Sequence, residues 1–335
     1  MAENKTTTTG ENNLLLVENL SVTVRNSGKK LIQNLNFSIP KGEIFGLVGE
    51  SGSGKSLTAT VILGMLSKSL EVTSGTVKLG QSEITSLSEK ELRNIRGHDS
   101  AYLSQNYQSF FTPFIKVGKQ FIEIIRCHTN MSRKEAKKVA IHWLNRVHLP
   151  AERVFNSYPD ELSGGQLQRA SIASAIMFRP KLIIADEPTT ALDVLTGERI
   201  LDLLCELKEE LNCSILLISH DLRHIINRTQ TVGVMYGGQI VEIGKTSAVV
   251  ADPIHPYTNL LLQSRLKLSN QPPLELQTML GEPGLIAEEG CPFSKRCPSV
   301  MKSCSNLVPM NSIGTHHSAA CHLVKAEREE RYVTH

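Results

Sequence analysis

The chain has 335 residues, of which 40% are hydrophobic and 21% are charged, and its formal net charge is +3. This composition is typical of a folded globular protein with one large core and an appendage, or with two domains. The charge is spread without a basic block, which argues against nucleic acid as a partner. No apolar run approaches the roughly 18 residues of a membrane span, and no signal-peptide pattern opens the chain. We therefore expect a cytoplasmic protein that touches a membrane only through a partner.

The first half of the chain predicts strands followed by a helical insertion. Residues 1–13 carry few apolar side chains and predict a disordered tail, so the fold should begin near Leu14. Apolar runs at 14–24 and 31–39 predict antiparallel strands before a central strand at 44–48. A strand at 76–79, a helix at 88–95 and a strand at 100–103 follow. From about 106 to 178 the apolar residues recur at helical spacing, which predicts a helical insertion.

The second half returns to alternating strands and helices. Strands are predicted at 182–185, 214–218, 231–235 and 239–243, with helices at 195–211 and from Asp221. This alternation predicts an α/β fold around a mostly parallel sheet. Beyond Arg265 the chain becomes proline-rich and carries four of its seven cysteines, which predicts a separate C-terminal extension.

A glycine-rich segment lies between the strand predicted at 44–48 and a helix-like run at 57–66. Its pattern, G-x-x-x-x-G-K-S, is that of a loop that binds phosphate groups through backbone N–H donors, with glycines leaving room for the ligand. The Lys55 ammonium would then reach the β- and γ-phosphates, and the Ser56 hydroxyl would bind Mg²⁺. The predicted ATP-binding residues here are Gly49, Glu50, Ser51, Gly52, Ser53, Gly54, Lys55, Ser56 and Leu57.

Two further stretches suggest phosphate chemistry. Asp186 and Glu187 end the apolar strand at 182–185, and because strand side chains alternate, one carboxylate can face Mg²⁺ while the other faces an attacking water. A serine followed by two glycines opens a helix that runs to about Phe178, which makes a second anion site. This second site consists of Ser163, Gly164, Gly165 and Gln166. Taken alone, each stretch is also compatible with a simple helix cap.

Together these stretches resemble the ATPase subunits of ABC transporters, whose signature LSGGQ stands here at 162–166. The resemblance implies that Glu187 is the general base, that Gln105 senses Mg²⁺ and water, and that His220 contacts the γ-phosphate. It places Asp193 in the loop by which two subunits sense each other. The implied Mg²⁺ ligands are Ser56, Gln105 and Asp186, and the implied catalytic set is Glu187, His220, Gln105 and Lys55.

The resemblance also implies an architecture. It implies a RecA-like, mostly parallel sheet with an antiparallel β subdomain and a helical subdomain at about 106–178, all within an ATPase domain at 14–265. A small Cys-rich extension at 266–335 follows. One departure concerns adenine, because Arg25, Asn26 and Ser27 stand where many relatives carry an aromatic side chain that stacks on the base.

Within the superfamily the chain resembles the peptide/nickel importers, through the sequence His255-Pro256-Tyr257-Thr258 and the cysteine-rich tail. This resemblance implies ATP-driven import of di- and oligopeptides, with nickel or a metal chelate as the alternative cargo. It implies a heterodimer with a second ATPase, two membrane permeases, an external binding protein and a place on the cytoplasmic face of the cell membrane. Two alternatives remain. A non-transport ABC ATPase is disfavoured by a single cassette without sustained heptads, and a metal-binding regulatory module with a vestigial ATPase is disfavoured because all the catalytic positions are filled.

The tail cysteines have spacings that fit no standard metal motif. They are Cys291, Cys297, Cys304 and Cys321. Four thiolates can hold zinc or an iron–sulfur cluster, and the spacing alone does not choose between these two groups and a tail that binds no metal. The resemblance to peptide-importer subunits favours a 4Fe–4S cluster. The other cysteines, Cys127, Cys205 and Cys213, are predicted core thiols. For His316 and His317 a solvated loop is favoured over a role as metal ligands.

Overall fold

The computed structural model of the protein describes residues 12–263, 282, 284–314 and 316–324. Most of the predicted tail lies outside the described residues, and the first strand begins at Asn13. The predicted domain boundary at 265/266 also falls outside them, so it stays a prediction. Among the described residues, no helix is both long and apolar enough to cross a membrane.

The strands form two sheets. One is antiparallel in the order β2-β1-β4-β5, with β1 at Asn13–Val24, β2 at Lys30–Pro40, β4 at Leu70–Leu79 and β5 at Ser82–Glu83. The other has the order β11-β12-β10-β9-β3-β8-β7-β6. Its central strands are β9 (Thr231–Tyr236), β3 (Ile44–Val48), β8 (Ser214–Ser219), β7 (Leu182–Asp186) and β6 (Ser100–Leu103), which pair in parallel.

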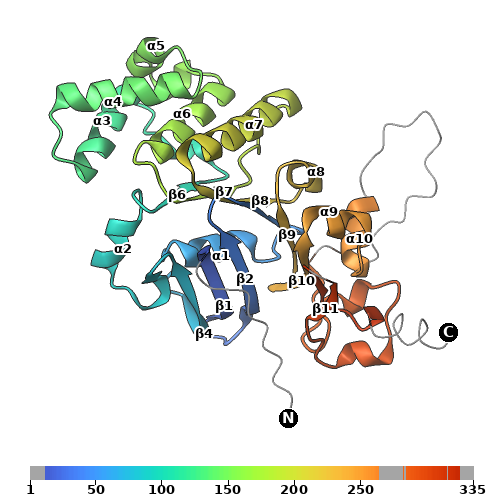
Figure 1. Ribbon diagram of the computed structural model, residues 1–335. Helices are drawn as coiled ribbons and strands as arrows, with labels where there is room; N and C mark the ends of the chain where they lie inside the picture. Colours follow the sequence, from blue (N-terminus) through green and yellow to red (C-terminus); the bar gives the residue numbers. More distant parts are fainter. Residues whose placement is uncertain (1–11, 264–281, 283, 315, 325–335) are drawn as a thin grey trace, which may run out of the picture.

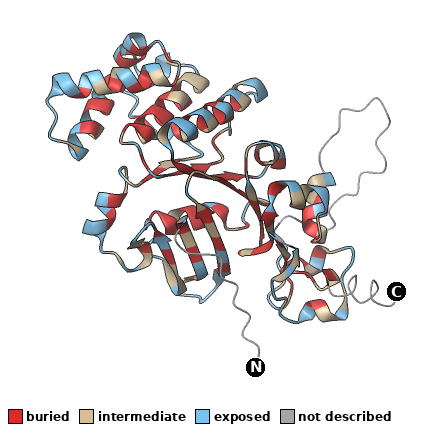
Figure 2. Cartoon of the chain, viewed as in Figure 1, coloured by how far each residue is buried: buried red, intermediate tan, exposed pale blue. Residues whose placement is uncertain are grey.

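The parallel strands form the buried centre of the molecule. Every residue of β3, β7 and β8 is buried, as expected for strands covered on both faces (Figure 2). The antiparallel sheet packs below them in the view of Figure 1, and α1 (Lys55–Ile62) lies between the two sheets. Carboxyl ends of parallel strands meet at one edge of a sheet, which brings the ends of β3, β6, β7 and β8 together.

The predicted helical insertion is present. It contains α3 (Val117–His128), α4 (Arg133–Arg146), α5 (Ala151–Asn156) and α6 (Gly164–Ile176), which stand apart from the antiparallel sheet in Figure 1. Ser132 begins α4 with a reciprocal capping box to Glu135, a local device worth about 0.5–2 kcal/mol. Trp143 and Phe121 are buried in its core.

The remaining helices flank the parallel sheet. They are α2 (Glu89–Ile95), α7 (Val194–Leu211), α8 (Leu222–Ile226), α9 (Thr246–Ala251) and α10 (Pro256–Gln263). Ser88 and Glu91 form a capping box at the start of α2, which covers the helix predicted at 88–95. The predicted strand at 76–79 is only the end of β4, which starts at Leu70 because it pairs with β1 along its length.

The C-terminal extension is joined to the main sheet. Its strands β11 (Asn311–Gly314) and β12 (His317–Ala319) continue the sheet beyond β10 (Gln239–Lys245) by antiparallel pairing. Phe293 belongs to the same hydrophobic core as the helical insertion. The extension therefore shares its sheet and its core with the rest of the fold and lies beside α9 and α10 (Figure 1).

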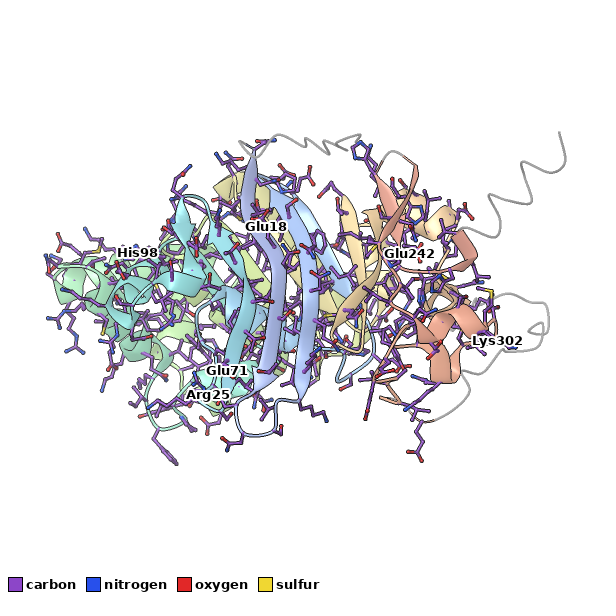
Figure 3. The ribbon with its side chains drawn as sticks, turned by 90° about the horizontal axis from the view of Figure 1, so that it is seen from below. Glu18, Arg25, Glu71, His98, Glu242 and Lys302 are labelled. Atoms are coloured by element: carbon purple, nitrogen blue, oxygen red, sulfur yellow. The ribbon has the colours of Figure 1, made fainter. Side chains whose placement is uncertain are left out.

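Two predictions about single side chains are wrong. Cys127 is exposed and not a core thiol, because it lies on the outer face of α3. His317 is buried and lies 2.7 Å from a carboxylate oxygen of Glu242, and is not on a solvated loop. Glu242 itself is fully buried on β10 (Figure 3), and His317 joins the backbone N–H groups of Ile254 and His255 as the partners that a buried carboxylate requires.

Candidate nucleotide site

The glycine-rich loop wraps around the start of α1. A Cβ atom on Gly49 would lie 2.1 Å from the backbone oxygen of Met235, so the close approach of β9 requires glycine there. Gly54 caps α1 with φ of 104°, a backbone conformation that L side chains rarely adopt. The loop thus presents backbone N–H groups at a helix N-terminus, which is the arrangement that binds phosphate.

Lys55 is the first residue of α1 and its side chain folds back over the loop. Its ammonium donates hydrogen bonds to the backbone oxygens of Gly49 at 2.7 Å and Glu50 at 2.8 Å. Burial lowers the pKa of Lys55, while Glu187, Asp186 and Glu50 act in the opposite direction. These two hydrogen bonds hold the Lys55 ammonium next to the backbone of the phosphate loop.

Asp186 lies at the end of β7, next to Ser56. The Ser56 hydroxyl donates to Asp186 Oδ1 at 3.1 Å, and the Tyr102 hydroxyl donates to Oδ2 at 3.0 Å. Burial raises the pKa of Asp186, although both of these hydrogen bonds oppose the shift. A hydroxyl and a carboxylate side by side are oxygen ligands of the kind that Mg²⁺ takes.

Glu187 follows Asp186 and is surrounded by three polar groups. Gln105 Nε2 and Thr190 Oγ1 each donate to Glu187 Oε2 at 3.2 Å, and His220 Nδ1 lies 3.2 Å from Oε1. The backbone of Glu187 has a φ of 47°, in the left-handed region that residues other than glycine seldom adopt. The carboxylate is 16% exposed and therefore remains accessible to a water molecule.

A cavity of about 770 Å³ lies at this site. Its walls include the phosphate loop, Gln105, Glu187 and His220, together with Leu31 and Leu261, which add apolar surface. The sequence-predicted catalytic residues thus lie together, although Lys55 begins α1 and Gln105, Glu187 and His220 follow the ends of β6, β7 and β8.

The signature residues lie around a different hollow, of about 290 Å³. Ser163 caps α6 and forms a reciprocal capping box with Gln166. Asp193 caps α7 by accepting a hydrogen bond from the backbone N–H of Thr196 at 2.9 Å. Ser163, Gly164, Gly165 and Asp193 line this hollow together, apart from the phosphate loop of the same chain.

Sequence reasoning missed several residues of the site. Tyr102 and Thr190 hold the two carboxylates, and Tyr257 and Arg296 contact Glu50 of the phosphate loop. Tyr257 belongs to the sequence at 255–258 that carries the resemblance to peptide/nickel importers, but no local pattern linked that sequence to the phosphate loop.

The four tail cysteines gather in the C-terminal extension. Burial raises the pKa of Cys291 to about 11, and the neighbouring thiols of Cys304, Cys321 and Cys297 act in the same direction. His322 Nε2 is buried without a hydrogen-bond partner among the described residues. Within those residues, however, no group of three or more histidine, cysteine or acidic side chains has the arrangement needed to hold a metal ion.

The fold and this site define a phosphate-loop ATPase of the ABC type. Residues 32–190 match the protein family described as "ABC transporter". Residues 241–304 match the family described as "Oligopeptide/dipeptide transporter, C-terminal region". The chain is 39% identical over 315 residues to the oligopeptide transport ATP-binding protein OppD of Salmonella typhimurium, with 92% of this chain and 93% of that protein covered. The chain therefore belongs to the family of ABC transporter ATP-binding proteins, and it is an ATPase.

The chain is also similar to a metal import ATP-binding protein and to a solved ATP-binding cassette. The chain is 41% identical over 258 residues to the metal-staphylopine import system ATP-binding protein CntD of Staphylococcus aureus, covering 77% of this chain and 95% of that protein. A solved dimeric ATP-binding cassette in a post-hydrolysis state with ADP and phosphate superposes with a TM-score of 0.62 and 29% identity. That comparison covers 69% of this chain and 98% of the solved chain. The predicted ABC ATPase fold is confirmed.

Proposed function

We propose that the protein binds and hydrolyses ATP to power import of di- and oligopeptides across the cytoplasmic membrane. The observation that carries the ATPase part is the single cavity in which the phosphate loop, Gln105, Glu187 and His220 meet. The peptide cargo is supported by the match of residues 241–304 to the oligopeptide/dipeptide transporter region. Similarity to an oligopeptide transport protein over 92% of the chain supports it further.

Each residue of the site has a proposed role. Glu187 acts as the general base toward a water in line with the γ-phosphate, and Gln105 orients that water. Lys55 and His220 stabilise the charge that develops on the phosphate oxygens. The hydroxyl of Ser56 and the carboxylate of Asp186, which are hydrogen-bonded to each other, together with Gln105, are suited to hold Mg²⁺, which would neutralise the phosphates.

We infer a head-to-tail pair of ATPase subunits, one of them a non-identical homologue. In that arrangement, ATP lies between the phosphate loop of one subunit and the signature residues Ser163, Gly164, Gly165 and Gln166 of the other. The separation of the two hollows within this chain supports the idea, because one chain does not enclose the nucleotide with both. The similarity to a solved dimeric cassette is consistent with it.

The helical insertion is the proposed contact with two membrane permeases, which would hold the protein on the cytoplasmic face of the membrane. Its first segment carries exposed apolar side chains, with Phe114 90% exposed and Phe110 and Ile115 also exposed. Apolar side chains in such number at the surface favour a protein partner. An external substrate-binding protein would deliver the peptide.

Uptake in whole cells tests the cargo. Cells that lack this gene are compared with cells in which the wild-type gene is restored, using labelled di- and oligopeptides and, in parallel, nickel. We expect restoration to recover peptide uptake and leave nickel uptake unchanged. Recovery of nickel or metal-chelate uptake alone would favour the second candidate, a metal importer, which the similarity to CntD supports. No change in either would favour a non-transport ATPase.

We also propose that Cys291, Cys297, Cys304 and Cys321 hold a 4Fe–4S cluster, with Zn²⁺ as the alternative. Thiolates are the ligands that both take, and the mutual effect of these thiols on the pKa of Cys291 supports their proximity. The described conformation lacks a ligating arrangement, so binding would require the thiols to move closer. When bound, such a cluster would crosslink the extension and stabilise its fold.

Metal analysis of anaerobically purified full-length protein tests this proposal. We expect about four irons and four acid-labile sulfides per chain, and their loss in Cys297→Ser. The exposed Cys127→Ser is the matched control and should keep the wild-type content. Zinc in place of iron would select the alternative, and protein with neither metal would contradict both.

A further inference from the structure

Glu50, the second residue of the phosphate loop, is bound by an arginine 246 residues away in the sequence. Arg296 lies in a short helical turn at Ser294–Arg296 of the C-terminal extension. Its Nη1 and Nη2 donate to the two carboxylate oxygens of Glu50 at 2.7 and 3.1 Å. The Arg296 side chain is 2% exposed and that of Glu50 is 20% exposed, so water screens this two-pronged ion pair only weakly.

Glu50 has a second contact with the C-terminal part of the chain. Its backbone N–H donates to the Tyr257 hydroxyl at 2.7 Å. Tyr236 accepts from Arg296 Nη1 at 3.3 Å and donates to the backbone oxygen of Leu285 at 2.7 Å. The rings of Tyr236, Tyr257 and Phe293 pack with centroids 4.7 to 5.3 Å apart. A rigid aromatic cluster therefore supports the arginine where it contacts the loop.

The location of Glu50 makes this ion pair relevant to ATP. Glu50 lines the same cavity as Lys55 and Ser56, and its backbone oxygen holds the Lys55 ammonium. A free carboxylate in that cavity would repel the triphosphate and would compete for Lys55. In the ion pair, the guanidinium cancels this charge and occupies both carboxylate oxygens.

We propose that Arg296 is a positioning residue for ATP: by neutralising Glu50 and fixing the phosphate loop, the C-terminal extension completes the nucleotide site. The proposal requires the ATPase activity and not the peptide cargo. Its failure would leave the proposed import function untouched, and a change of cargo would leave this proposal standing.

ATP binding and hydrolysis by the purified full-length protein test the proposal. We expect Arg296→Gln to raise the KM and Kd for MgATP about tenfold and to change kcat less than about threefold, because a ground-state contact is lost. The matched control is Lys302→Gln, which removes an exposed positive charge from the same extension (Figure 3) and should keep wild-type values.

The double variant Glu50→Gln/Arg296→Gln separates charge neutralisation from simple support of the fold. It removes the carboxylate together with its partner, so we expect a KM several-fold closer to wild type than that of Arg296→Gln alone. Arg296→Lys keeps the positive charge but loses the bidentate contact with Glu50. Its KM for MgATP should therefore lie between those of the wild type and Arg296→Gln. Thermal unfolding of each variant identifies any that misfold.

Two results would overturn the proposal. One is an unchanged KM for MgATP in a folded Arg296→Gln protein. The other is a double variant that binds ATP as poorly as Arg296→Gln, because the effect would then come from lost structure and not from the uncovered Glu50 charge.

Discussion

Replacing Glu187 with glutamine is expected to lower ATP turnover by about 10²- to 10⁴-fold while ATP still binds. Glutamine has nearly the same shape and can keep contacts with Gln105, Thr190 and His220, which surround the carboxylate at 3.2 Å. It has no basic oxygen pair to accept a proton from water, so positioning survives and proton transfer is lost. Steady-state hydrolysis and equilibrium MgATP binding on the same purified protein measure the two effects separately.

The matched control for this variant is Glu18→Gln. Glu18 is an exposed carboxylate on β1 of the antiparallel sheet (Figure 3), outside the cavity that holds Glu187. Its replacement should leave turnover unchanged. Near-normal hydrolysis by Glu187→Gln would remove Glu187 from the role of general base.

Replacing Lys55 with alanine is expected to weaken MgATP binding itself, by about 10- to 100-fold. The Lys55 ammonium is the cation at the start of α1, and it is already held over the loop by the backbone oxygens of Gly49 and Glu50. Its removal takes away a charge-assisted contact to the β- and γ-phosphates. Equilibrium binding of MgATP to the purified chain measures the loss.

Lys41→Ala serves as the control for Lys55→Ala. Lys41 is exposed in the turn between β2 and β3, outside the residues that line the nucleotide cavity, so its loss should not change the Kd. A Lys55→Ala protein that binds MgATP with wild-type affinity would contradict the assignment of this loop as the phosphate site.

Local sequence patterns predicted the phosphate loop and the buried strand before Asp186, because a short segment of the chain determines each of them. The glycine spacing at 49–54 fixes a loop at a helix N-terminus, and the structure places that loop between β3 and α1. The apolar run before Asp186 predicted a buried strand, and β7 is buried throughout. Carboxyl ends of parallel strands meet at one edge, so Gln105, Glu187 and His220 could be expected to lie near one another. Their roles in catalysis remain predictions.

Contacts between distant segments could not be predicted in this way. Arg296 lies in a stretch where the sequence draws attention to cysteines, and nothing near it indicates a partner in the phosphate loop. His317 looks like a loop residue by composition, but its strand pairs with β10 and brings it to the buried Glu242. Tyr102 is a half-buried residue of β6 with no local pattern that marks it. Its hydrogen bond to Asp186 arises because β6 pairs with β7, which ends at Asp186.

Uptake of labelled peptide tests most directly whether this ATP site powers transport. Cells that lack the gene receive either the wild-type gene or Glu187→Gln, and the two proteins are compared at equal abundance. We predict that the wild type restores uptake and that Glu187→Gln leaves it at the level of the deletion. Full restoration by Glu187→Gln would contradict the claim that ATP hydrolysis at this site drives import.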